Sequence, residues 1–215
     1  MVSRILRHDF PVVVIVGVPG VGKSTIISLA IKLLNEKGFN AIALNYGDFI
    51  LEELKSLSLV SSRDDLRKLP LRIQLQHQSS AAARMINYAK KLFENKIPER
   101  SVLIVDTHLW IKTRAGLWPG LPHHVLQVLL PDLIVLVEAE PSEILARQLR
   151  DPSRYRRDYA DAKLIEELQE LNRREALIVA TLTGAAIKII VNREGLAEEA
   201  AKELVESIAN LLSPG

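Results

Sequence analysis

Cysteine is absent from the 215 residues, so neither a disulfide framework nor a thiolate metal site can form. Neither positive nor negative charge is in excess, because the chain has 28 Lys and Arg and 26 Asp and Glu. The net charge of +2 gives no overall basic field that would favour a nucleic acid partner. No apolar stretch reaches the roughly 18 residues of a membrane-spanning helix, and the first ten residues lack the apolar run of a signal peptide. We therefore expect a cytoplasmic protein with no membrane association.

Five short apolar runs, rich in β-branched residues, stand out against this background. They are nearly continuous rather than alternating, which is typical of strands covered on both faces of a parallel sheet. Segments of helical periodicity separate them. The alternation predicts one α/β domain over residues 1–215, with three layers and a five-stranded parallel sheet flanked by helices. The expected strands are 11–16, 41–45, 101–106, 132–138 and 186–192, and the expected longer helices are 23–37, 70–94, 162–183 and 196–212.

The first run ends in "GVPGVGKS", which matches the phosphate-binding loop (P-loop) pattern G-x-x-x-x-G-K-[ST] between a strand and a helix. Glycines let backbone N–H groups surround phosphate oxygens, and the helix N-terminus favours the same anion. We expect Lys23 to reach the β- and γ-phosphates of ATP and Ser24 to offer its hydroxyl to Mg²⁺. The residues predicted to bind ATP here are Gly17, Val18, Pro19, Gly20, Val21, Gly22, Lys23, Ser24 and Thr25.

Acidic and histidine side chains follow the third expected strand, in "LIVDTH". Asp106 lies where a P-loop protein commonly orders Mg²⁺ with a second oxygen ligand, although an acid at a strand end also caps turns. His108 is consistent with two roles, either facing a phosphate acceptor or supporting the loop. The stretch after it, 110–122, carries Lys112 and is rich in Gly and Pro, so we expect a long irregular loop at the ligand edge of the sheet.

Arginines gather at 147–158, after the helix that follows the fourth strand. Guanidinium groups bind phosphate bidentately and stabilise the charge that develops in phosphoryl transfer. We interpret the run as a short catalytic lid at about 151–161, against the alternative of a solvated or nucleic-acid-binding surface. Arg63 and Arg67, in "SSRDDLRKLP", are candidates to bind the phosphate of a second nucleotide, although Ser62 before acidic residues is also a plain helix N-cap.

The chain resembles the archaeal-type adenylate kinases over nearly its whole length. The resemblance is carried, in order, by "GVPGVGKST", "NYGD", "RDDLRKL", "VDTH", "GLWPGLP", "LNRREA" and "LTGAAIKII". The resemblance implies a nucleoside monophosphate kinase fold, the reaction ATP + AMP ⇌ 2 ADP with Mg²⁺, a cytoplasmic location and assembly as a trimer. It departs from the family at Ser62, where an acid is expected. The large lid of bacterial adenylate kinases is absent.

Carried over by position, the resemblance implies roles for further residues. An AMP-binding segment would span about 46–95. The predicted lid is one residue longer than in the family, so either Arg156 or Arg157 would contact the phosphate. Asn192 would lie near the adenine of ATP. The implied catalytic residues are Lys23, Arg147, Arg154, Arg156, Arg157 and Arg173; the implied acceptor-binding residues are Gly47, Arg63, Arg67, Thr107, His108 and Lys112; the implied Mg²⁺ ligands are Ser24 and Asp106.

Two other functions fit much of this pattern. A kinase with another acceptor, such as a different nucleoside monophosphate or a small hydroxyl compound, would carry the same Lys23 and arginines. A non-catalytic nucleotide switch would keep the P-loop as well. A GTPase is disfavoured because "NREG" at 192–195 lacks the Lys and Asp of the N-K-x-D guanine motif.

Overall fold

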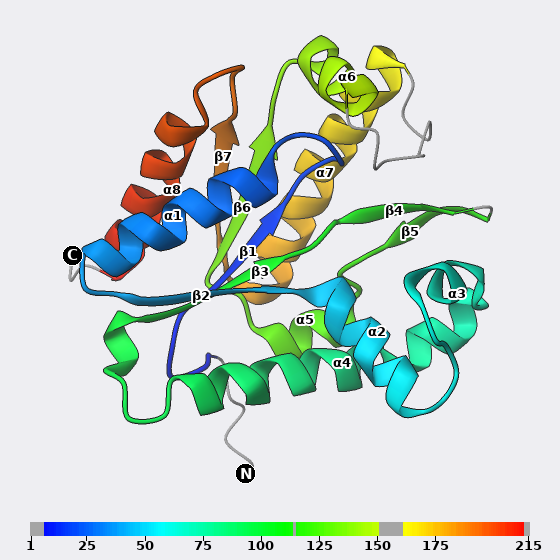
Figure 1. Cartoon of the computed structure of the whole chain (residues 1–215), viewed down its shortest axis with the longest axis horizontal. Helices are drawn as coiled ribbons and strands as arrows, with labels where there is room; N and C mark the ends of the chain where they lie inside the picture. The colour runs from blue at the N-terminus through cyan, green and yellow to red at the C-terminus, as the bar shows by residue number, and fades with distance from the viewer. Residues whose placement is uncertain (1–6, 114, 151–160, 213–215) are drawn as a thin grey trace.

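A computed structural model describes residues 7–113, 115–150 and 161–212 of the chain (Figure 1). Five parallel strands form one sheet in the order β2-β3-β1-β6-β7, so the first strand lies at its centre. The runs expected to be strands are confirmed within a residue or two. Their bounds are β1 (Val12–Val16), β2 (Asn40–Asn45), β3 (Ser101–Asp106), β6 (Leu133–Glu138) and β7 (Ala186–Val191).

Helices cover both faces of this sheet (Figure 1). One apolar core lies between the sheet and α1, α8 and the first half of α7, and the other lies between the sheet and α2, α4, α5 and the second half of α7. The four expected longer helices are confirmed, and Gly38 takes the positive φ of +81° typical after a helix end. The helices are α1 (Lys23–Glu36), α2 (Tyr46–Ser56), α3 (Arg63–Lys68), α4 (Leu71–Leu92), α5 (His123–Leu129), α6 (Pro141–Arg150), α7 (Ala162–Thr183) and α8 (Ala197–Leu212), with a 3₁₀ turn at Pro98–Arg100.

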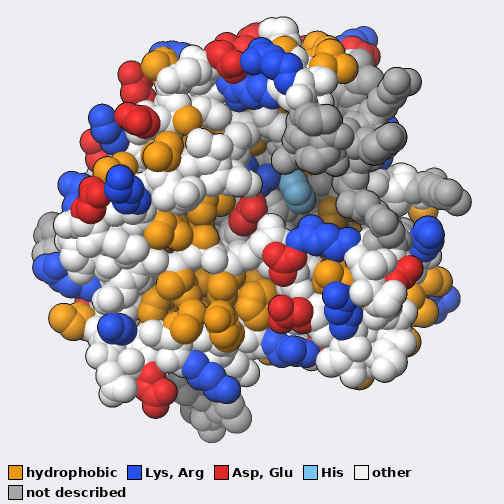
Figure 2. Space-filling view, in the orientation of Figure 1, with side chains coloured by type: hydrophobic (Ala, Val, Ile, Leu, Met, Phe, Trp, Pro, Cys, Tyr) orange, Lys and Arg blue, Asp and Glu red, His pale blue; other side chains and the backbone are white. Residues whose placement is uncertain are grey.

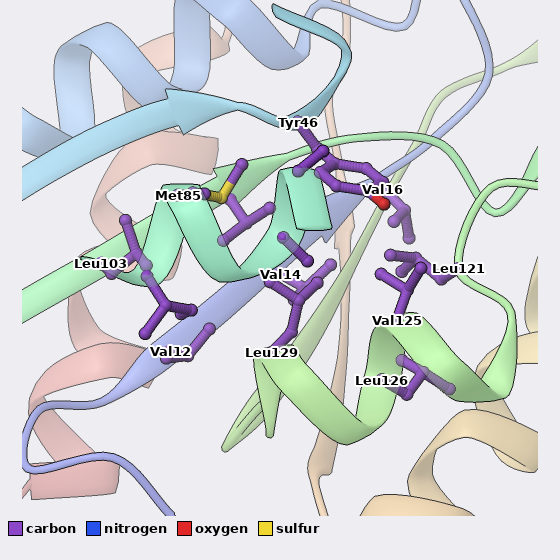
Figure 3. Packing of buried hydrophobic residues seen from close by; sticks show 14 of the residues in the cluster. Val12, Val14, Val16, Tyr46, Met85, Leu103, Leu121, Val125, Leu126 and Leu129 are labelled. Atoms are coloured by element: carbon purple, nitrogen blue, oxygen red, sulfur yellow. The ribbon is translucent and has the colours of Figure 1, made fainter. Parts of the chain in front are cut away.

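Side chains of alternate residues in β1 enter opposite cores, and every residue of that strand is fully buried. Figure 3 shows Val12, Val14 and Val16 packed beneath Tyr46 and Met85 on one side. Burying apolar side chains of this size contributes roughly 1.5–3 kcal/mol each. The central strand, and with it the start of the P-loop, is therefore held between two buried cores.

The stretch 110–122 is not the irregular loop expected from its Gly and Pro content. β4 (Trp110–Thr113) and β5 (Gly116–Pro119) pair antiparallel as a separate hairpin. The Thr113 hydroxyl donates to the Gly116 carbonyl over 2.8 Å, and Gly116 has a φ of +117°, which suits glycine. In the part of the chain that the structure describes, no helix is both long and apolar enough to cross a membrane.

Candidate nucleotide-binding site

The P-loop joins the buried end of β1 to the first turn of α1. Gly20 and Gly22 adopt φ values of +87° and +99°, which a residue with a side chain rarely takes. At Gly22 an added Cβ would lie 2.2 Å from Nδ2 of Asn192, so this position requires glycine for space as well. Val18 and Val21 bury their side chains in the core, which leaves the loop backbone to face a ligand.

Lys23 is the first residue of α1 and is only 8% exposed. Its Nζ donates to the Gly17 carbonyl over 3.3 Å and lies 3.8 Å from Oδ1 of Asp106. Burying an ammonium group is costly unless it is paired. Here one partner, Gly17, directly follows β1, and the other, Asp106, ends the neighbouring strand β3. The lysine therefore spans the mouth of the loop, next to the carboxylate predicted to help hold Mg²⁺.

Asp106 is positioned by the neighbouring strand. It is the register partner of Asn45 at the carboxyl ends of β2 and β3, and Asn45 Nδ2 donates to Asp106 Oδ2 over 3.1 Å. A cavity of about 340 Å³ begins here and has Ser24, Asn45 and Asp106 among its lining residues. The cavity continues between α1 and β2, and Figure 2 shows hydrophobic side chains gathered along β2 on this face of the molecule.

Ser24 and Asp106 thus share one cavity, as oxygen ligands of one cation must. Within residues 7–113, 115–150 and 161–212, no group of three His, Asp or Glu side chains is arranged to hold a metal ion. This donor set suits Mg²⁺, which keeps several waters and takes the rest of its ligands from one or two protein oxygens and substrate phosphates.

His108 contacts the P-loop. Its Nδ1 lies 3.1 Å from the Gly17 carbonyl, and since a carbonyl accepts, this nitrogen carries the proton. The preceding Thr107 is buried, and its N–H donates to Ile15 in β1 over 3.1 Å. Of the two roles considered for His108, this contact favours support of the loop.

Arg147 and Asn192 lie behind the P-loop. Both donate to the Val21 carbonyl, Arg147 over 3.2 Å and Asn192 over 2.7 Å. Arg147 also donates to Glu143, to Glu194 and to the backbone carbonyl of Asn192. The hydrogen bond from Arg147 lowers the pKa of Glu194 below its usual range. Four donor contacts of Arg147 are thus used within the protein.

Arg173 is held by an acid that the sequence reasoning missed. Its Nε and one terminal nitrogen donate to the two carboxylate oxygens of Glu138, over 2.8 and 2.6 Å, and its other nitrogen contacts Glu170. The paired carboxylate raises the pKa of the guanidinium further. Glu138 is 5% exposed and ends β6. Asp106 was predicted to be functional because it is an acid at the end of an apolar strand. Glu138, at the end of β6, carries the same signal.

Four of the residues predicted to bind the acceptor lie on α2, α3 and the hairpin, whereas Thr107 and His108 directly follow β3. Gly47 is in the first turn of α2, and Asp48 beside it forms an ion pair with Arg63 at the start of α3. Arg67 lies in α3, and Lys112 is an exposed residue of β4. The N-cap interpretation of Ser62 is confirmed, since its side chain and Asp65 form a capping box.

The remaining predicted residues fall into two groups. Thr25 is exposed in the first turn of α1, beside Ser24. Arg154, Arg156 and Arg157, with the lid predicted at about 151–161, lie outside the described residues except for Asp161, which caps α7. The site that the structure describes therefore comprises the P-loop, Asp106, His108, Arg147, Asn192 and the Glu138–Arg173 pair.

Comparisons with known proteins agree with this geometry. A family model described as an AAA domain matches residues 16–169. An adenylate kinase of Saccharolobus solfataricus is 43% identical over 195 residues, which cover 91% of this chain and 97% of that protein. Adenylate kinases of Methanopyrus kandleri and Methanocaldococcus jannaschii are 46% and 45% identical, over 93% and 91% of this chain and 98% and 96% of theirs.

Proposed function

Because the chain belongs to the adenylate kinase family, whose members are phosphotransferases, we propose that it transfers the terminal phosphoryl group of ATP reversibly to AMP in a Mg²⁺-dependent reaction that gives two ADP. The observation that carries this proposal is the buried Lys23 at the mouth of the P-loop, next to Asp106 at the carboxyl edge of the sheet.

On the donor side, the backbone N–H groups of 17–25 surround the phosphates of ATP and Lys23 neutralises the β- and γ-phosphates. To do so, its ammonium group exchanges the Gly17 carbonyl, 3.3 Å away, for phosphate oxygens. Ser24 and Asp106 would hold Mg²⁺, which when bound neutralises charge on the phosphates. Asn45 orients the Asp106 carboxylate by its 3.1 Å hydrogen bond.

On the acceptor side, we assign AMP to the segment 46–95, with Arg63 and Arg67 at its phosphate and Gly47, Thr107 and Lys112 nearby. The phosphate of AMP is already an anion, so the transfer needs no strong general base. Positioning and charge neutralisation supply the rate enhancement. His108 supports the P-loop through its contact with the Gly17 carbonyl.

Arginines supply the remaining positive charge. We propose that Arg154, Arg156 and Arg157 form the lid over the transferring group, and that Arg173 contributes from α7. A single arginine of this kind can be worth about 10³–10⁵ in rate. Since Arg147 already makes four contacts with acids and carbonyls behind the P-loop, we assign it to holding the loop and the adenine side of ATP together with Asn192.

We also propose that the protein works in the cytoplasm, where ATP and AMP are found, and that it assembles as a homo-oligomer, a trimer by its family resemblance. The whole chain would act as one kinase domain. Size-exclusion chromatography with light scattering measures the assembly directly; a mass of a single 24.0 kDa chain would contradict it.

The acceptor is tested by a coupled ADP-formation assay with ATP and Mg²⁺, in which AMP, CMP, UMP, dTMP and GMP are offered in parallel at 25 °C and at elevated temperature. We expect AMP to be strongly preferred, and omission of Mg²⁺ to abolish the signal. A preference for another monophosphate would replace AMP as the acceptor, and turnover of none of them would contradict the proposed reaction.

A further inference from the structure

The P-loop presents its N–H groups inward only if the carbonyls of the same peptides point outward. In a trans peptide the C=O and N–H groups point in opposite directions, so whatever holds one fixes the other. In this structure the carbonyls of Gly17, Pro19 and Val21 all accept hydrogen bonds from side chains outside the loop, but Gly17 also accepts one from Lys23 at the mouth of the loop. The bonds to Pro19 and Val21 therefore set the direction of the N–H groups of residues 20 and 22.

The middle carbonyl is held by a residue that neither the motif nor the family resemblance singled out. Gln148 Nε2 donates to the Pro19 carbonyl over 2.6 Å. Its Cγ also covers Gly20, where an added Cβ would lie only 2.7 Å from it. Gly20, with a φ of +87°, is therefore needed both for its backbone conformation and for this close approach.

Gln148 and its neighbour Arg147 lie in the last turn of α6, and they hold two different carbonyls of the loop. Gln148 binds Pro19 while Arg147 binds Val21, so one helix end sets two alternate peptides of the P-loop. These contacts span 126 and 129 residues of sequence, so the fold, and not the loop itself, brings this helix end to the P-loop.

We propose that Gln148 is a positioning residue for ATP: by holding the Pro19 carbonyl outward it aims the N–H of Gly20 at the phosphates. The proposal rests on the proposed function only in taking ATP as the ligand of the P-loop. Gln148 does not touch the transferring group, and its effect passes through the orientation of one peptide. The expected consequence is a change in ATP affinity with no change in affinity for the acceptor.

The test is Gln148→Met, which keeps the length and packing of the side chain over Gly20 but removes the donor. Leu149→Met, at a neighbouring residue that is 75% exposed, is the matched control. Binding of ATP with Mg²⁺ and of AMP is measured by isothermal titration calorimetry, together with steady-state kinetics and the thermal unfolding temperature. We expect the Kd and KM for ATP to rise about three- to tenfold, as for one lost hydrogen bond, while the values for AMP match those of the control.

An unchanged ATP affinity in Gln148→Met would overturn the proposal, and so would equal weakening of ATP and AMP, which would indicate a general structural role. Should Gln148→Met fail to fold, Gln148→Ala removes the same donor and must move the ATP affinity in the same direction. The ATP titration needs no acceptor. A wild-type protein that binds ATP but does not phosphorylate AMP would therefore contradict the proposed function while still testing Gln148.

Discussion

The P-loop and α3, which lies within the predicted acceptor segment 46–95, differ in what holds their shape. The P-loop is held by His108, Gln148 and Asn192, which are 91, 129 and 171 residues from the carbonyls they bind. The start of α3 is held by its own capping box and by an ion pair between Arg63 and Asp48, whose side chains are 56% and 50% exposed. Figure 1 shows α3 at the outer edge of the molecule, whereas the P-loop joins the central strand of the sheet.

This difference predicts how each of the two nucleotides binds. A loop fixed by long-range hydrogen bonds that are partly or fully buried is ready to bind phosphate before the ligand arrives. A short helix such as α3, held by a local cap and an exposed ion pair, opens at a lower free energy, since such pairs contribute roughly 0–1 kcal/mol. We therefore expect the donor site to be preorganised and the acceptor site to close around its ligand.

The largest effect is expected from Lys23→Met. Removing the ammonium group leaves the β- and γ-phosphates without their principal protein charge, so turnover should fall by on the order of 10³ or more. The coupled ADP assay measures turnover, and circular dichroism with AMP titration serves as the control for folding and the acceptor side. Near-normal turnover in a folded variant would overturn the P-loop assignment.

An intermediate effect, on stability, is expected from Glu138→Gln. This change removes the buried carboxylate that receives two hydrogen bonds from Arg173 and should lower the free energy of unfolding by about 2 kcal/mol. Urea denaturation at pH 7 gives this value. Glu170→Gln is the matched control, because Glu170 contacts the same arginine at the surface, and its loss should cost about 0–1 kcal/mol. Equal losses in the two variants would show that burial of Glu138 does not matter.

The smallest effect is expected at the cap of α3. Hydrogen bonds from Ser61 and Ser62 lower the pKa of Asp65 from its ordinary 3.8 to about 2. Because folding lowers this pKa, ionised Asp65 stabilises the folded state. That stabilisation is complete above about pH 4 and is lost as the pH falls through about 2. Ser62→Ala should raise the pKa toward 3.8, seen by NMR titration of the carboxyl group, and should raise the KM for AMP by a few-fold at most.

The same Ser62→Ala variant sharpens the comparison between the two regions. Its KM for ATP should stay at the wild-type value, since no contact of the capping box reaches the P-loop in the part of the chain described. An equal rise in KM for ATP and AMP would mean that the acceptor segment and the donor loop are not independent.

Much of the fold was predictable because its signals are local. The continuous apolar runs predicted all five parallel strands, and the cap at Ser62 could be read from four consecutive residues. The stretch 110–122 misled because Gly and Pro suggested an irregular loop, whereas Thr113 and Gly116 close a hairpin. The pairing of those two short strands depends on the residues opposite each other, which composition does not show.

The sequence by itself determined the P-loop, the place of Lys23 and Ser24 within it, and the strand end that carries Asp106. Only the tertiary structure decided that His108 faces Gly17, that Gln148 holds Pro19 and that Glu138 receives Arg173. The physical reason is distance along the chain. A motif fixes its own backbone within a few residues, whereas the side chains that hold its carbonyls are brought to it by the order of the strands in the sheet.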